Sequence, residues 1–247
     1  MKIIDKALNL IFPPKCYSCD ELLPYYKTDA LCDDCLAAWK IEKSDICPDC
    51  EKKHAKCRCK PDILRGHVKN TLHLARYTKD ESVTSKLILS LKDTNGKYLY
   101  SFVADELCEL IKAGIKNYES YVITYVPRSK SKKLKYGTDQ AQTLAREVAK
   151  RLNIRCIHVI KHIAGKEQKK LTGAERLENA VSSYDLKKGS LLDICNRKII
   201  LLDDVMTTAS SMYACASLLN LSGAASITCI TVGKTYREKK KEEQEII

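Results

Sequence analysis

Two adjacent carboxylates at the end of a buried strand are the most informative chemical feature of this sequence. Residues 199–202 are all apolar, which is typical of a buried strand in a parallel sheet. Asp203 and Asp204 follow at once, then small hydroxyl residues, and residues 211–222 have apolar positions at helical spacing. A strand end, a short polar turn and a helix N-terminus form the usual anion site of an open α/β sheet.

The residue types in this stretch predict a ribose 5-phosphate ligand. Backbone N–H groups and hydroxyls of the turn can bind a phosphate monoester. The residues of the turn are Thr207, Thr208, Ala209, Ser210 and Ser211. The two acids suit sugar hydroxyls and a hydrated Mg²⁺ rather than phosphate. The alternative is an ordinary buried strand followed by a helix-capping Asp, which does not account for the whole pattern of residues 199–211.

A second polar segment follows another predicted strand, residues 121–126. Pro127 fixes a turn after this strand, and Arg128 and Ser129 are the candidate contacts of an anionic ligand there. Three cations follow in the same segment: Lys132, Lys133 and Lys135. The alternative is that this charge run is a solvated face.

Residues 161–179 are polar, long and rich in cations. Loops of this length inside a compact domain are commonly lids or disordered segments. A lid over the site would exclude water from the bound ligand. The candidate residues of this mobile loop are Gln168, Glu175, Arg176 and Asn179. A surface loop with a short helix over residues 174–180 is the alternative.

Eight of the thirteen cysteines lie between Cys16 and Cys59. In the cytosol, close cysteine pairs indicate metal rather than disulfides. The first set has the spacing of a zinc ribbon, with a closed and therefore structural Cys₄ shell: Cys16, Cys19, Cys32 and Cys35. A redox dithiol is the competing interpretation of any one Cys-x-x-Cys pair.

The second set of four is a weaker signal: Cys47, Cys50, Cys57 and Cys59. Its last pair is Cys-x-Cys, and Glu51 stands where a ribbon knuckle usually has Gly. His54 or His67 could replace a ligand, or the ligands of the two sets could interleave. The sequence therefore predicts one or two structural zinc ions.

The chain of 247 residues predicts a small cysteine-rich head over residues 1–66 and an α/β domain over residues 67–247. Alternating strands and helices indicate a doubly wound parallel sheet. Beyond the segments above, helices are expected at residues 82–91, 98–115 and 139–152, and strands at residues 155–160 and 226–232.

The formal net charge of +12 indicates a polyanionic partner or an anionic substrate. The sequence has no run of about 18 apolar residues that could form a membrane helix. The first twelve residues contain Asp5 and Lys6 and no small-residue cleavage site, so we expect a cytoplasmic protein without a membrane span.

Residues 199–211 resemble the phosphoribosyl-pyrophosphate (PRPP) loop of type I phosphoribosyltransferases. The resemblance implies that Asp203 and Asp204 meet the ribose hydroxyls, with Mg²⁺ accompanying PRPP, and that the following turn holds the 5′-phosphate. It also implies that the turn after residues 121–126 faces the pyrophosphate, with Arg128 and Ser129 as its contacts. Ala209 stands where that family often has Gly. It also implies the fold of these enzymes, a parallel sheet flanked by helices.

The whole chain resembles the ComF family of bacterial competence proteins. The matching features are a Pro-Pro-x-Cys-x-x-Cys head, a Val-Pro-(basic)-Gly-x-x-Gln segment, a Gln…Glu-Arg-x-x-Asn segment and the PRPP loop, in this order. The chain departs from the family at Thr138-Asp139, usually Phe-Asn, and at Lys133 and Lys161, usually arginines. The resemblance implies handling of single-stranded DNA in natural transformation, with proteins of the competence machinery as partners.

Three functions remain open on the sequence. The chain could be a ComF-type factor that binds PRPP or a related ribose phosphate and uses Lys132, Lys133 and Lys135 on single-stranded DNA. It could be a metabolic phosphoribosyltransferase, a glycosyltransferase-class enzyme acting on a base or amine. It could also be a PRPP-sensing docking module without catalysis. No catalytic residue is assigned from the sequence.

Overall fold

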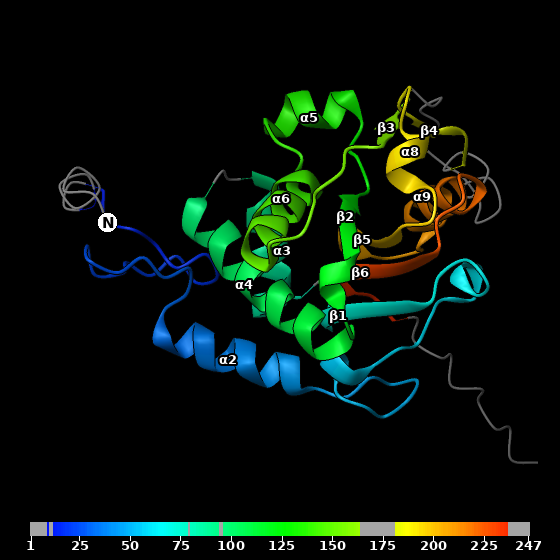
Figure 1. The fold of residues 1–247 in the computed structure, drawn as a ribbon. Helices are drawn as coiled ribbons and strands as arrows, with labels where there is room; N and C mark the ends of the chain where they lie inside the picture. The colour runs from blue at the N-terminus through cyan, green and yellow to red at the C-terminus, as the bar shows by residue number, and fades with distance from the viewer. Residues whose placement is uncertain (1–8, 10–11, 79, 94–95, 164–180, 237–247) are drawn as a thin grey trace, which may run out of the picture.

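The computed structural model describes residues 9, 12–78, 80–93, 96–163 and 181–236. Its centre is a four-stranded parallel sheet of order β1-β6-β5-β2 (Figure 1). The strands are β1 Asn70–Arg76, β2 Tyr121–Tyr125, β5 Lys198–Met206 and β6 Ser226–Lys234. The predicted class, a parallel sheet flanked by helices with a cysteine-rich head, is confirmed.

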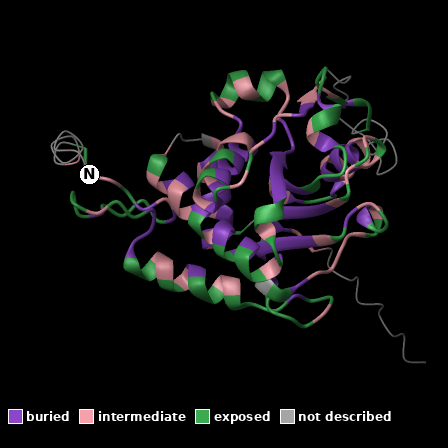
Figure 2. Cartoon of the chain, in the orientation of Figure 1, coloured by how far each residue is buried: buried purple, intermediate pink, exposed green. Residues whose placement is uncertain are grey.

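Alternating residues of the strands are buried in two different cores. Figure 2 shows the strands of the central sheet as largely buried. On one face Ile200 and Leu202 pack under three helices. These are α3 Val83–Asp93, α4 Lys97–Gly114 and α6 Gln140–Leu152. On the other face Ile199 and Leu201 pack under α9 Ser210–Leu221. Side chains pointing both ways are buried, which explains the unbroken apolar run that predicts β5.

The cysteine-rich head packs on the α3–α4 face rather than standing apart. Its helix α2 Asp33–Ser44 buries Trp39, whose ring meets that of Phe102 in α4 at a centroid distance of 6.0 Å. The Glu42 carboxylate accepts the N–H groups of Val83 and Thr84 at 2.8 Å each and so caps α3. The head and the helical layer therefore share one apolar core.

Several short elements complete the chain. An antiparallel pair, β3 Ile160–His162 and β4 Tyr184–Leu186, forms a separate two-stranded sheet. The others are α5 Lys130–Tyr136, α8 Leu191–Ile194 and the 3₁₀ turns η1 His54–Lys56, η2 Asp62–Leu64 and η3 Tyr118–Ser120. Among the described residues, no helix has the length and apolar character needed to cross a membrane.

Two expectations from the sequence need correction. The strand predicted over residues 155–160 is a single parallel bridge between Cys156 and Ile123, followed by β3 in the other sheet. The predicted strand over residues 199–202 continues to Met206, because its polar end still pairs with β6. The acidic pair therefore lies within the last part of β5, not after it.

The single Trp gives a direct test of the shared core. With zinc in excess, unfolding followed by Trp39 fluorescence and by far-UV circular dichroism should give one coincident transition. Trp39→Ala should lower the free energy of unfolding by about 3–5 kcal/mol, measured by circular dichroism. Tyr25→Ala, in an exposed part of the head, should change it by less than about 0.5 kcal/mol. Two separate wild-type transitions would contradict a shared core.

Candidate functional site

The acidic pair stands at the carboxyl end of β5 with its two side chains on opposite faces of the sheet. Besides burial, the Asp203 charge contributes to the raised pKa values of Tyr184 and Cys215, which lie on the α9 face. The Asp204 charge likewise adds to burial in raising the pKa of Tyr100, which lies on the α4 face. Asp203 accepts the Asp204 N–H at 2.9 Å, and Asp204 accepts the Val205 N–H at 2.7 Å. These bonds orient both carboxylates from the backbone.

Burial raises the pKa of Asp203 well above its usual value, and the neighbouring Asp204 charge adds to the shift. Both causes disfavour a second negative charge at this place. A cation or a set of donors that approaches the pair would relieve that repulsion. The two carboxylates are thus positioned to bind a cation or to accept hydrogen bonds from a ligand, and their arrangement lowers the stability of the fold.

The predicted phosphate loop, residues 207–211, turns directly from β5 into α9. Ala209 precedes the helix with φ 61° and ψ 6°, in the left-handed region, and its side chain cannot cap the helix. No side chain accepts a hydrogen bond from the start of α9, so the first N–H groups of this helix are available to an anion. The left-handed backbone explains why a glycine would suit this position, and Ala there stores about 1 kcal/mol of strain.

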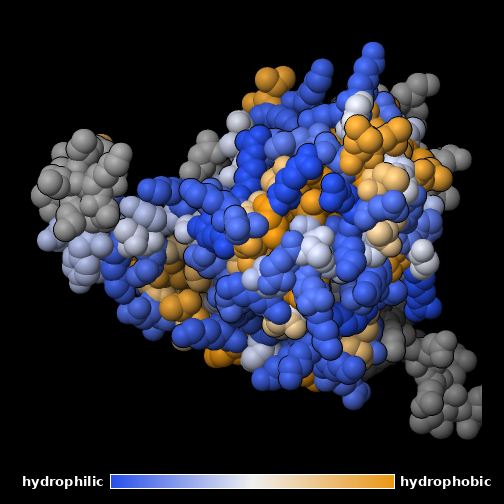
Figure 3. Space-filling view, in the orientation of Figure 1, coloured by the Kyte–Doolittle hydropathy of each residue, from blue (hydrophilic) through white to orange (hydrophobic). Residues whose placement is uncertain are grey.

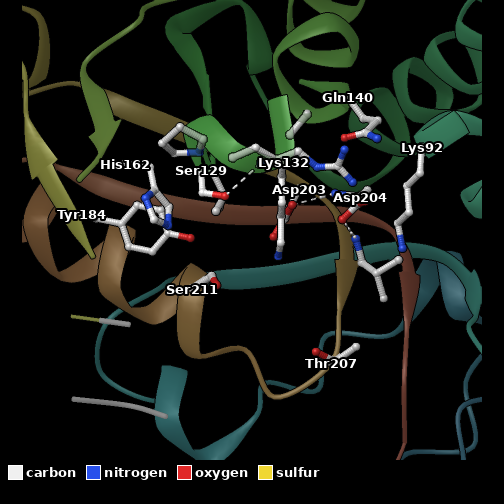
Figure 4. Close-up of a pocket in the computed structure, with 15 residues that line it drawn as sticks. Lys92, Ser129, Lys132, Gln140, His162, Tyr184, Asp203, Asp204, Thr207 and Ser211 are labelled. Atoms are coloured by element: carbon white, nitrogen blue, oxygen red, sulfur yellow. Dashed lines mark hydrogen bonds between the residues drawn. The ribbon is translucent and has the colours of Figure 1, made fainter. Parts of the chain in front are cut away.

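These groups face a cavity of about 280 Å³ at the carboxyl ends of β2 and β5 (Figure 4). Asp203, Asp204, Thr207 and Ser211 lie on one side of it. The other side is built from the ends of α3, α5 and α6, the loop after β2 and the β3–β4 pair. Its side chains are those of Lys92, Arg128, Ser129, Lys132, Gln140, His162 and Tyr184.

Two side chains reach this cavity with buried donors that have no partner among the described residues. They are Arg128, through Nη1, and Gln140, through Nε2. The Arg128 guanidinium also stacks on Tyr136 at 5.0 Å. Buried donors without partners are costly, and an anionic ligand would satisfy both.

The loop after β2 is held by a buried carboxylate. Asp139, 4% exposed, caps α6 and accepts the backbone N–H of Arg128 at 3.1 Å. Lys133 pairs with the same carboxylate at 2.8 Å. Ser129 caps α5 by accepting the Lys132 N–H at 3.4 Å. The structure therefore places Arg128 and Ser129 at the cavity, as expected, and also gives Ser129 a structural role.

The three lysines predicted as DNA contacts are in three different environments. Lys132 lines the cavity. Lys133 is engaged by Asp139, and Lys135 lies 5.0 Å from the Tyr136 ring on the exposed side of α5. All three belong to α5, and their role as DNA contacts stays a prediction.

Sequence reasoning did not identify Lys92, His162 and Tyr184 as cavity residues. The His162 and Tyr184 rings meet at 5.0 Å, one from each strand of the β3–β4 pair. Burial lowers the pKa of His162, and Lys132 and Lys133 add to this. The predicted loop residues Gln168, Glu175, Arg176 and Asn179 lie outside the described residues.

The eight head cysteines form two separate groups of four. The first cluster is Cys16, Cys19, Cys32 and Cys35, and the second cluster is Cys47, Cys50, Cys57 and Cys59. Within each cluster all four Sγ atoms lie within 4.8 Å of one another. The Cys19 and Cys32 Sγ atoms are 3.7 Å apart, close to the edge of about 3.8 Å of a tetrahedral Zn–S₄ shell. Both groups could therefore hold zinc, and the ligands do not interleave.

The two clusters begin with the same knuckle. The carbonyls of Cys16 and Cys47 accept an N–H four residues on, from Asp20 and Glu51. Both of these residues have positive φ, 62° and 56°, so a non-glycine residue at the knuckle does not prevent the turn. Although burial opposes ionisation, backbone N–H bonds lower the pKa of Cys16 and Cys47 to about 7 each. One thiol in each cluster is thus prepared as a thiolate ligand.

The two histidines considered as alternative ligands lie elsewhere. His54 is fully buried, with Nδ1 3.1 Å from Nε2 of His73. The His67 ring packs edge-on against Tyr213 at 4.8 Å. Neither belongs to a group of potential metal ligands among the described residues.

No protein-family model and no curated protein matches this sequence. Solved structures that match include "the allosteric regulatory enzyme of purine biosynthesis", with a TM-score of 0.41 and 15% identity. That match covers 60% of this chain, which spans 30% of that enzyme's length. Hypoxanthine phosphoribosyltransferase from Staphylococcus aureus matches with a TM-score of 0.35 and 14% identity over 57% of this chain and 74% of that one.

Adenine phosphoribosyltransferase from Leishmania tarentolae matches similarly, with a TM-score of 0.35 and 14% identity, over 56% of this chain and 71% of that one. At such identities the matches concern the fold alone. The functional argument rests on the cavity.

Replacing Asp203, whose pKa is raised by burial, should stabilise the fold. The folded state holds the Asp203 proton above the unfolded pKa of about 3.9, so ionisation weakens folding as the pH rises. Asp203→Asn should therefore raise the free energy of unfolding by about 1–2 kcal/mol at pH 8, and by almost nothing near pH 4. Urea unfolding at both pH values measures this, and a loss of stability at pH 8 would contradict the electrostatic explanation.

Metal content tests the clusters. The purified protein should contain two zinc ions by mass spectrometry. Cys16→Ser with Cys19→Ser should remove one of them and unfold the first knuckle, because a structural zinc contributes roughly 10–16 kcal/mol of apparent binding free energy. Cys195→Ser, an exposed cysteine outside both clusters, is the matched control. A zinc content unaffected by the double substitution would refute the first site.

Proposed function

We propose that this chain binds PRPP, or a related ribose 5-phosphate, in the cavity at the ends of β2 and β5. One observation carries the proposal. The acidic pair, the uncapped start of α9 and three cations, Lys92, Arg128 and Lys132, converge on the same 280 Å³ cavity. A ligand with a diol between two phosphate-bearing ends matches this arrangement, with the diol at the acidic pair, one phosphate at the start of α9 and the other at the cations.

Each part of the ligand has a chemical counterpart in the cavity. Asp203 and Asp204 accept hydrogen bonds from the ribose hydroxyls, and residues 207–211 donate to the 5′-phosphate. Arg128 and Lys132 neutralise the pyrophosphate, and the unpartnered Nη1 of Arg128 gains an acceptor. Mg²⁺ bound with PRPP would neutralise its phosphates, and the acidic pair is the oxygen-ligand set that suits it.

We further propose a ComF-type role, in which the protein handles single-stranded DNA during natural transformation together with competence proteins. The order of the sequence motifs, the two cysteine clusters and the net charge of +12 support this role. Helix α5 is the candidate DNA surface because Lys130 and Lys135 are exposed on it, beside Leu134. In Figure 3 a small group of hydrophobic atoms in the region of α5 is surrounded by hydrophilic side chains. A cytoplasmic location would agree with this role.

Calorimetric titration of PRPP with Mg²⁺ tests the ligand. Asp204→Asn should weaken binding by about 2–5 kcal/mol, because it removes the charge that receives the diol and the cation. Asp105→Asn, an acidic residue of α4 paired with Arg151, should bind like the wild type. Unchanged affinity in Asp204→Asn would exclude this cavity as the PRPP site.

The same titration with single-stranded DNA in competition separates the functions. Lys130→Ala with Lys135→Ala should weaken DNA binding and should reduce the slope of log affinity against log salt concentration by about 0.7 per lost phosphate contact. PRPP affinity should stay unchanged in this variant. Lys132→Ala should weaken PRPP binding. PRPP binding without DNA binding, together with consumption of PRPP by a base or amine, would favour the metabolic enzyme. PRPP binding with neither DNA binding nor turnover would favour the docking module.

A further inference from the structure

The end of β6 lies between the phosphate loop and the second cysteine cluster. Thr235 is bonded to the loop side. Its N–H donates to the Met206 carbonyl at 3.0 Å, and its hydroxyl lies 3.3 Å from the carbonyl oxygens of both Met206 and Thr207. The first residue of the phosphate loop is thus held by β6.

The residues on either side of Thr235 interact with the second cluster. Although burial opposes it, the Tyr236 hydroxyl helps to lower the pKa of the Cys47 thiol, and it lies 2.7 Å from Nε2 of His73. The Lys234 ammonium donates to the Cys59 carbonyl at 3.0 Å and lies 4.7 Å from the Tyr236 ring. Residues 234–236 therefore join two cluster ligands to the phosphate loop.

The surroundings leave this segment little freedom. Lys234 is 5% exposed, and His54 and His73 are fully buried beside Tyr236. The Cys59 carbonyl also accepts the hydroxyl of Thr71 in β1 at 2.8 Å. The second cluster is hence bonded to both β1 and β6.

The first cluster has a different attachment. Its knuckle is bonded to α3, where the Ser90 hydroxyl donates to the Tyr17 carbonyl of the knuckle at 3.1 Å. None of the hydrogen bonds of the described residues joins it to residues 206–211. It provides an internal comparison within the same chain.

We infer that metal binding at the second cysteine cluster positions the phosphate loop through residues 234–236, and so sets the affinity for the ribose phosphate. Four thiolates held around one ion fix Cys47 and Cys59, which fixes Tyr236 and Lys234 and, between them, Thr235. Thr235 and Tyr236 are positioning residues, since they act on the ligand site through Thr207 and Cys47. The affinity part of this inference rests on the proposed function, whereas the positioning part does not.

Hydrogen exchange of the zinc-loaded protein, without ligand, tests the positioning. Thr235→Val keeps the side-chain shape and the backbone bond but removes the hydroxyl. Exchange of the Tyr213 amide, whose N–H donates to the Ala209 carbonyl of the loop at 2.8 Å, should then rise about 5- to 10-fold. Tyr236→Phe should raise exchange of the same amide and also speed zinc release to a chelator. Ser90→Ala removes the matched hydroxyl–carbonyl bond of the first cluster and should leave exchange of the Tyr213 amide unchanged.

Reciprocity provides the second readout. If zinc at the second cluster raises PRPP affinity, PRPP with Mg²⁺ must raise the zinc affinity of that cluster by the same factor, measured at equilibrium against a chelator. Thr235→Val should abolish this increase while both zinc ions remain bound. Unchanged exchange of the Tyr213 amide in Thr235→Val and Tyr236→Phe would overturn the inference. If the wild type does not bind PRPP, the proposed function fails, and the exchange result still decides whether the cluster positions the loop.

Discussion

The parallel pairing of β2 with β5 is the constraint on which the rest of the site depends. Their register, from Tyr121 with Lys198 to Tyr125 with Leu202, brings both carboxyl ends to the same edge of the sheet. The loop after β2 carries the cations, and the end of β5 carries the acids. An antiparallel pairing of these two strands would have placed these charges at opposite ends of the sheet. The cavity is thus a consequence of strand direction, as in other open α/β sheets.

The site is built against local stability in two places. Asp203 and Asp204 are adjacent acids at a partly buried strand end, and Ala209 is held in a left-handed conformation. Both are tolerated because the surrounding sheet and α9 determine the backbone here. Such features concentrate where a protein meets a ligand, because a group already satisfied within the protein gains little from binding.

Much of this could be predicted from the sequence because the signals are local. The helices α3, α4, α6 and α9 follow their apolar periodicity, and the acidic pair follows an unbroken apolar run. The second cluster was also visible, although Cys57-x-Cys59 and Glu51 depart from a ribbon; the turn tolerates Glu51 at positive φ. These features need only neighbours in the chain.

The parts that were missed depend on distant neighbours. β1 was not predicted, because it buries the polar residues Thr71 and His73, whose partners come from the head and from Tyr236. Lys92 and Gln140 reach the cavity from the ends of two different helices. The pairing of Lys133 with Asp139 likewise requires the turn between α5 and α6, so a charge run alone could not separate structural from exposed lysines.

The head is therefore part of the architecture of the domain rather than an independent attachment. A cysteine-rich head of this size has too small a core to be stable alone, and here its Trp39 completes the core of the α/β domain. In return, Glu42 of the head caps α3, the helix whose last turn carries Lys92 into the cavity. The second cluster is bonded to the ends of β1 and β6. The head thus contacts both the helical layer beside the cavity and two strands of the sheet, through Thr71 in β1 and Lys234 in β6.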